Sequence, residues 1–192
     1  QKVVIAYRDV GNSNVGTAIV GTVSGASISF GSEVTFESGQ SNYIAATFDS
    51  TNNKVVIAYQ DAGNSYYATA VVGTVSGTSI SFGTPVVFEN ATVSFISPVF
   101  DSNANKVVIA YRDTGNSNYG TFTVGTVSGT SISFETAVVF QTANSYYNSA
   151  TFDSSNNKVV NAYRNDGNSG YGTAVVFQPD STNLTSENFI GL

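Results

Sequence analysis

The sequence predicts an all-β protein, and three observations support this. Short apolar runs rich in Val, Ile, Thr, Tyr and Phe recur along the chain, separated by turns rich in Asn, Asp, Gly and Ser. No stretch shows the apolar period of about 3.6 residues that is typical of a helix. The runs also repeat, because the motif that starts at Lys2 returns at Lys54, Lys106 and Lys158, always 52 residues further on. A regular period of this length indicates a repeat architecture.

Each period is predicted to contain four strands. In the second period they span about residues 43–48, 54–60, 67–75 and 79–88. The strand with the motif Lys-Val-Val-Ile-Ala-Tyr is apolar on both faces, so we expect a covering layer on each side of it. The strand before it consists of small residues, which suit a place where sheets converge. A small sheet covered on both faces by copies of itself is typical of a β-propeller blade.

We therefore predict a β-propeller built from four repeats of four strands each. The repeat domain covers residues 1–181, with units near 1–41, 42–93, 94–145 and 146–192. The first unit begins at its second strand and so lacks its inner strand. Residues 182–192 are predicted to form a degenerate last strand or the passage to a following domain. An open β-solenoid and a strand-exchanged fibre are the alternative architectures.

The composition excludes several classes of function. The chain has no Cys and no His, which excludes a thiolate nucleophile, a Ser-His-Asp triad and imidazole metal sites. Seven basic residues and a net charge of −6 argue against nucleic-acid binding. No apolar run approaches the roughly 20 residues of a membrane span. The acidic residues recur mostly as equivalent copies, whereas acid–base catalysis needs carboxylates in unlike environments, so we do not expect an enzyme.

Two recurring motifs are candidates for ligand binding. The Tyr-Arg pair supplies rings that stack on sugars and guanidinium groups that bind hydroxyls or carboxylates. The Asp-x-Gly-Asn-Ser loop supplies oxygens suited to calcium, although such a loop is also an ordinary turn. The candidate ligand residues are Tyr7, Arg8, Asp9, Asn12, Tyr59, Asp61, Asn64, Tyr111, Arg112, Asp113, Asn116, Tyr163, Arg164 and Asn168. Packing between blades is the alternative role for the tyrosines, and pairing with the adjacent Asp is the alternative for the arginines.

Two further features are candidates for surface recognition. Aromatic residues gather before the small-residue strand of each period, where they serve either recognition or packing. These residues are Tyr43, Tyr66, Tyr67, Phe95, Tyr146 and Tyr147. Asn90 and Asn183 each begin an Asn-x-Thr triplet, which is an N-glycosylation acceptor in a glycosylating host.

The repeat resembles a known kind of sequence. Phe-Asp-Ser-x-Asn-Asn-Lys-Val-Val-Ile-Ala-Tyr and Gly-Thr-Val-Ser-Gly-Thr-Ser-Ile-Ser-Phe are similar to tandem repeats of predicted phage tail-fibre and aquatic bacterial surface proteins of the adhesin type. The resemblance covers nearly the whole chain. It implies a role in an extracellular fibre or in adhesion, with no defined catalytic residues.

These observations predict a non-enzymatic recognition module outside the cell or on a virion surface. Its expected partners are cell-surface glycans, bound weakly at each repeat and more tightly through multivalency. The alternative is a structural subunit of an extracellular fibre or appendage, with or without glycosylation, that self-assembles through its open strand edge. No cofactor is expected, with calcium as a secondary possibility.

Overall fold

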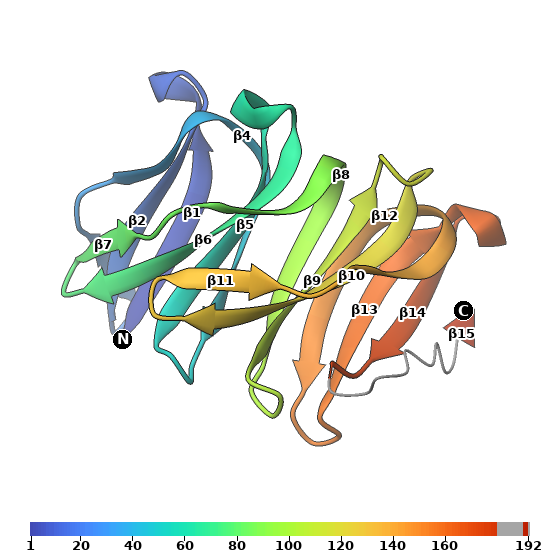
Figure 1. Cartoon of the computed structure of the whole chain (residues 1–192). Coiled ribbons are helices and arrows are strands. Elements are labelled where there is room, and N and C mark those ends of the chain that lie inside the picture. The colour runs from blue at the N-terminus through green and yellow to red at the C-terminus, as the bar shows by residue number, and fades with distance from the viewer. Residues whose placement is uncertain (180–189, 192) are drawn as a thin grey trace.

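The strands form one continuous antiparallel sheet that does not close on itself. The computed structural model describes residues 1–179 and 190–191. Within them, strand pairing runs from β1 (Lys2–Asp9) to β15 (Ile190–Gly191), which lie at the two ends of the path. Figure 1 shows the N-terminal strands at one end of the molecule and β14 with β15 at the other.

The strands follow the 52-residue repeat. Three long strands of 16 residues link successive sheets: β4 (Val34–Asp49), β8 (Val86–Asp101) and β12 (Val138–Asp153). The other strands are β2 (Val15–Ser24), β3 (Ser27–Phe30), β5 (Lys54–Asp61), β6 (Tyr67–Ser76), β7 (Ser79–Phe82), β9 (Lys106–Asp113), β10 (Tyr119–Ser128), β11 (Ser131–Phe134), β13 (Lys158–Asn165) and β14 (Tyr171–Phe177). Short 3-10 turns follow β1, β5 and β13: η1 (Val10–Asn12), η2 (Ala62–Asn64) and η3 (Asp166–Asn168).

Each complete unit is an antiparallel sheet with four strand positions. In the second unit the order is the second half of β4, then β5, then β6, with β7 and the first half of β8 both paired along β6. The strand expected near residues 79–88 is therefore two segments with a break between them. Gly83 lies at this break, where an added Cβ atom would approach the Thr130 carbonyl oxygen to 1.9 Å. The close passage of two backbones requires glycine there.

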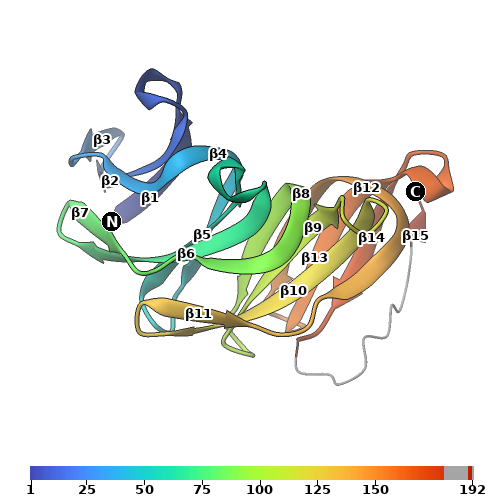
Figure 2. The same ribbon diagram turned by 45° about the horizontal axis from the view of Figure 1, so that its top comes forward.

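A β-bulge in each long strand carries the chain from one sheet to the next. In β4, residues 34–40 pair with β2 and residues 41–49 pair with β5, and the register with β5 shifts between Asn42 and Ala45. The same shift occurs between Ser94 and Ser97 and between Tyr146 and Ser149. Bulges bend a strand and strengthen its twist. Figure 2 shows the resulting row of sheets, with β3, β7 and β11 at successive positions along it.

The prediction of a β-propeller is wrong, because the sheet path is open. The first and last sheets lie at opposite ends of the molecule and do not pack on one another (Figure 1). Repeats fix the contact between neighbouring units, and stability in such arrays comes from those nearest-neighbour contacts. Closure requires in addition a particular rotation from each unit to the next. The repeat pattern does not specify that rotation, so it could not predict a closed ring.

The hydrophobic cores lie between consecutive sheets. One core joins the first and second sheets, a second joins the second and third, and another joins the third and last. The expected covering of both faces holds for β5 and β9, where Ile57 and Ile109 are 0% exposed. In β1 the equivalent Ile5 is 42% exposed, since among the described residues only β2 pairs with β1 and no sheet covers its outer face.

Candidate functional site

Three bulged residues bring aromatic rings to one region of the surface. Tyr43, Phe95 and Tyr147 occupy equivalent places in the bulges of β4, β8 and β12, with φ angles of 48°, 54° and 56°. Large side chains rarely adopt this left-handed conformation, which costs about 1–3 kcal/mol per residue. Such strain is concentrated at functional sites. Tyr43 is 46% exposed and Tyr147 is 66% exposed, so these two rings are accessible to a ligand, whereas Phe95 between them is half-buried.

These rings and Tyr146 form a continuous cluster, here called the aromatic row. The centroid of the Phe95 ring lies 5.6 Å from that of Tyr43, 5.6 Å from that of Tyr146 and 5.0 Å from that of Tyr147. Arg112 stacks between two of them, with its Cζ atom 4.9 Å from the Phe95 centroid and 4.7 Å from the Tyr146 centroid. The row therefore combines flat apolar surface with a fixed cation.

The three arginines all reach this side of the sheets, from the ends of β1, β9 and β13. The Nε atom of Arg112 donates to Ser94 Oγ at 2.9 Å. The Cζ atom of Arg164 lies 5.3 Å from the Tyr146 ring, and its Nη2 pairs with Asp166 at 2.9 Å. Among the residues that the structure describes, neither Arg8 nor Arg112 forms an ion pair with a carboxylate.

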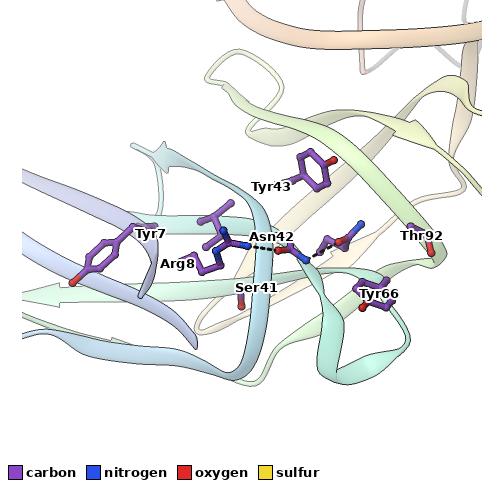
Figure 3. Close-up of a pocket in the computed structure, with 10 residues that line it drawn as sticks. Tyr7, Arg8, Ser41, Asn42, Tyr43, Tyr66 and Thr92 are labelled. Atoms are coloured by element: carbon purple, nitrogen blue, oxygen red, sulfur yellow. Dashed lines mark hydrogen bonds between the residues drawn. The ribbon is translucent and has the colours of Figure 1, made fainter. Parts of the chain in front are cut away.

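A polar groove of about 760 Å³ adjoins Tyr43 at the junction of β1 and β4. Arg8 Nη1 donates to Asn42 Oδ1 at 2.9 Å, and Asn42 Nδ2 donates to Gln60 Oε1 at 2.9 Å. Figure 3 shows Arg8 and Asn42 pointing toward each other, whereas Tyr7 points away from them. Tyr66 also lines the groove and is 48% exposed. Ring faces, amides and a guanidinium are thus presented together.

The repeated tyrosines predicted as ligand residues lie in the cores. Tyr59 and Tyr111 are 0% exposed and Tyr163 is 4% exposed. The hydroxyl groups of Tyr59 and Tyr111 donate to Glu37 Oε2 at 3.1 Å and Glu89 Oε2 at 3.2 Å. Burial, together with the nearby carboxylate, raises the pKa of each of these two phenols. The structure therefore places them in packing positions between sheets.

Tyr7 differs from its buried copies because its sheet has an open outer face. Its hydroxyl donates to Glu33 Oε1 at 2.5 Å, and this hydrogen bond, with some burial, raises the pKa of Tyr7 to about 12. One period later Pro85 stands at the position of Glu33, so the equivalent tyrosine, Tyr59, has no acid at that place. Tyr7 lies at the border of the polar groove, with its ring directed away from Arg8 and Asn42 (Figure 3).

The predicted loop residues form turns. Asp61 Oδ1 accepts from the backbone N–H groups of Gly63 at 2.8 Å and Asn64 at 3.1 Å. Asp9 and Asp113 accept in the same way from Asn12 and Asn116, both at 3.1 Å. These carboxylates thus cap their own turns. The candidate residues Asn12, Asn64, Asn116 and Asn168 are exposed at the tips of these turns.

Calcium binding remains a prediction. Among residues 1–179 and 190–191, no three Asp or Glu residues gather in a group that could hold a metal ion. The second set of repeated aspartates also caps turns, since Asp49 Oδ1 accepts from the backbone N–H groups of Thr51 at 3.0 Å and Asn52 at 2.9 Å. In the same part of the chain, no helix is long and apolar enough to cross a bilayer.

Two pairs of interacting carboxyl groups each join neighbouring units. Glu89 lies near Asp113, and burial raises the pKa of both, with the charge of Asp113 adding to the rise at Glu89. In the second unit, burial and the charge of Glu37 raise the pKa of Asp61. One period further on, amides stand at both equivalent positions, Gln141 and Asn165. The substitution by amides indicates that the charge is dispensable at this place in the fold.

Of the two predicted glycosylation sites, only Asn90 lies in the part of the chain that the structure describes. Asn90 lies in β8 and is exposed, so its side chain is accessible. Asn183 lies outside the described residues.

Sequence reasoning pointed to aromatic residues and arginines as candidates but missed the part played by the bulges. The aromatic residues at 43, 95 and 147 recur at the 52-residue period, and that recurrence was the available signal. Their left-handed backbone and the stacking of Arg112 between two rings depend on contacts between strands of neighbouring sheets. Asn42, which joins Arg8 to Gln60, carried no signal in the sequence.

No protein-family model matches the chain, and no curated protein matches it either. The resemblance to tail-fibre and adhesin repeats therefore stays a prediction.

Proposed function

We propose that this chain is a non-enzymatic, extracellular recognition module that binds carbohydrate through the aromatic row and the adjoining polar groove. The observation that carries the proposal is the set of rings with left-handed backbone at three equivalent bulges, of which Tyr43 and Tyr147 are exposed and Phe95 is half-buried, with Arg112 stacked between Phe95 and Tyr146. Sugar C–H faces stack on aromatic rings, and sugar hydroxyls pair with amide and guanidinium groups. Both kinds of group are present here side by side.

The arrangement of the row supports an extended ligand over a single sugar. Its rings come from β4, β8 and β12, so one ligand chain crossing the sheets would meet each ring in turn. Several weak contacts on one molecule then add up through effective concentration. A repeated scaffold is well suited to this, because it places equivalent groups at regular intervals.

The test is a glycan-array screen on the folded chain, followed by titration of the best oligosaccharide against variants. Tyr43→Ala removes an exposed ring of the row, and Tyr171→Ala removes a ring of similar exposure, 56%, that makes no contact with the row. We expect Tyr43→Ala to weaken binding about tenfold, equivalent to about 1.4 kcal/mol, and Tyr171→Ala to bind as the wild type does. Folded protein that binds no glycan, or equal affinity for the two variants, contradicts the proposal.

A further inference from the structure

Two contacts between neighbouring sheets have nearly the same composition. The first and second sheets present Val and Ala toward the sheet that follows, and the second and third sheets present Ile and Tyr toward the sheet that precedes. The contact between the third and last sheets differs, because Phe122 stands at the place of Ala70 and Asn161 at the place of Ile109. Between the first and second sheets, Ala18 and Val20 pack in one core with Ile57, Tyr59 and Ile80. Between the second and third sheets, the equivalent residues pack in the same way.

The first sheet presents an Ile-Tyr face that nothing covers within the described chain. We call it the isoleucine face, formed by Val3, Ile5, Tyr7, Ile28 and Phe30. Ile5 is 42% exposed, Ile28 is 43% exposed and Phe30 is 49% exposed. One period later the equivalents of the two isoleucines are 0% and 3% exposed. The first sheet thus leaves in solvent an apolar surface that is buried elsewhere in the same molecule, which is typical of an interaction site.

The last sheet presents the complementary surface at the other end of the molecule. Its outward residues are Val160, Ala162, Ala174 and Val176, here called the valine–alanine face. Ala162 is exposed and Val176 is 36% exposed. Inside the chain, Val and Ala at the same four positions cover the Ile-Tyr face of the next sheet. These residues are Val4, Ala6, Ala18 and Val20 in the first sheet, and Val56, Ala58, Ala70 and Val72 in the second.

We propose that the isoleucine face of one copy of this chain binds the valine–alanine face of a second copy. The contact would continue the sheet-to-sheet interface already present between neighbouring units, with the same residue types on both sides. Figure 1 places the first and last sheets at opposite ends of the molecule, and the inner side of each packs in a core, so one copy can bind two others through the outer sides. The contact joins two different surfaces, so it extends head to tail instead of stopping at a symmetric dimer.

This association needs no exchange of strands and is independent of carbohydrate binding. The two faces are on the flat sides of the first and last sheets, whereas the aromatic row lies at the bulges of the long strands. Tyr7 borders the polar groove and also belongs to the isoleucine face, but the variants used below leave Tyr7 unchanged. Failure of one proposal therefore leaves the other standing.

The test uses light scattering and sedimentation of the 192-residue chain over about a hundredfold range of concentration. Ile28→Lys places a charge on the isoleucine face, and Ala162→Lys places one on the valine–alanine face. Val10→Lys is the control, because Val10 is 70% exposed in the η1 turn and belongs to neither face. Circular dichroism and thermal melting confirm that each variant is folded, and Phe30→Lys replaces Ile28→Lys if the latter fails to fold.

The expected result is oligomers that grow with concentration for the wild type and for Val10→Lys, and monomers for the two face variants. Mixing Ile28→Lys with Ala162→Lys leaves one intact face on each partner, so the mixture should form a one-to-one dimer and nothing larger. A wild type that stays monomeric overturns the proposal and leaves the isoleucine face to a different protein. Oligomers that survive both face substitutions, or a mixture that stays monomeric, overturn it as well.

Discussion

A pair of asparagines in the last unit, Asn161 buried and Asn148 half-buried, offers a sharp test of the packing described above. Asn161 is 0% exposed and Asn161 Nδ2 donates to Asn148 Oδ1 at 3.1 Å. Two buried atoms of the pair, Asn161 Oδ1 and Asn148 Nδ2, have no hydrogen-bond partner. In the preceding unit the equivalent residues are Ile96 and Ile109, 7% and 0% exposed, and both belong to one core. The perturbation is the double variant Asn148→Ile with Asn161→Ile.

The magnitude follows from three contributions. Each unpaired buried polar atom costs about 1–3 kcal/mol, and this cost disappears. Each new isoleucine gains about 1.5–3 kcal/mol on burial. Against these gains stand the lost hydrogen bonds, including the one from Ser145 Oγ to Asn148 Oδ1 at 3.0 Å, at about 1 kcal/mol each. At the lower limits of these ranges the two gains amount to about 5 kcal/mol and the two lost hydrogen bonds to about 2 kcal/mol. Because Asn148 is only half-buried, we use these lower limits and expect the double variant to raise the free energy of unfolding by about 3 kcal/mol.

Urea denaturation at equilibrium measures this change, with both single variants included as a double-mutant cycle. Asn161→Ile alone should gain about 1 kcal/mol or less, because Asn148 then loses its buried partner. The converse pair, Ile96→Asn with Ile109→Asn, is the matched control and should destabilise by more than about 3 kcal/mol. A double variant no more stable than the wild type, or single effects that simply add, would refute the reasoning.

Three further predictions concern stability. Ile109→Ala should lower the free energy of unfolding by about 3 kcal/mol. Ile5→Ala should lower it by less than about 1.5 kcal/mol, because Ile5 is half exposed. Urea denaturation of the monomeric protein measures both changes. Glu89→Gln with Asp113→Asn should be more stable than the wild type at neutral pH. Burial raises both carboxyl pKa values in the folded state, so their contribution is present in acid and lost as the pH rises through those values. An advantage of this variant that shrinks toward neutral pH would contradict the prediction. If the turns bind no calcium, EDTA should leave the melting temperature unchanged, and a drop would establish a calcium site.

Much of the fold could be predicted from the sequence because its determinants are local. The 52-residue period, the alternation of apolar residues in residues 54–60 and the Asp-x-Gly-Asn-Ser turns each depend on a few neighbouring residues. These features were sufficient to predict the strands of each unit and the burial of both faces of β5. The candidate site was only partly predictable: Arg112 was singled out, whereas Tyr59 and Tyr111 belong to the cores.

By itself the sequence determined an all-β chain of stacked four-stranded units, because side-chain periodicity and turn chemistry act over a few residues. The tertiary structure decided three other matters. It set the rotation between sheets and hence the open path. It placed Phe95 and Tyr146 on either side of Arg112. It also left Ile5 exposed while burying the identical residue Ile109. Each depends on how separate sheets meet in space, and identical repeat sequences carry no information that distinguishes a unit at the end of the row from one inside it.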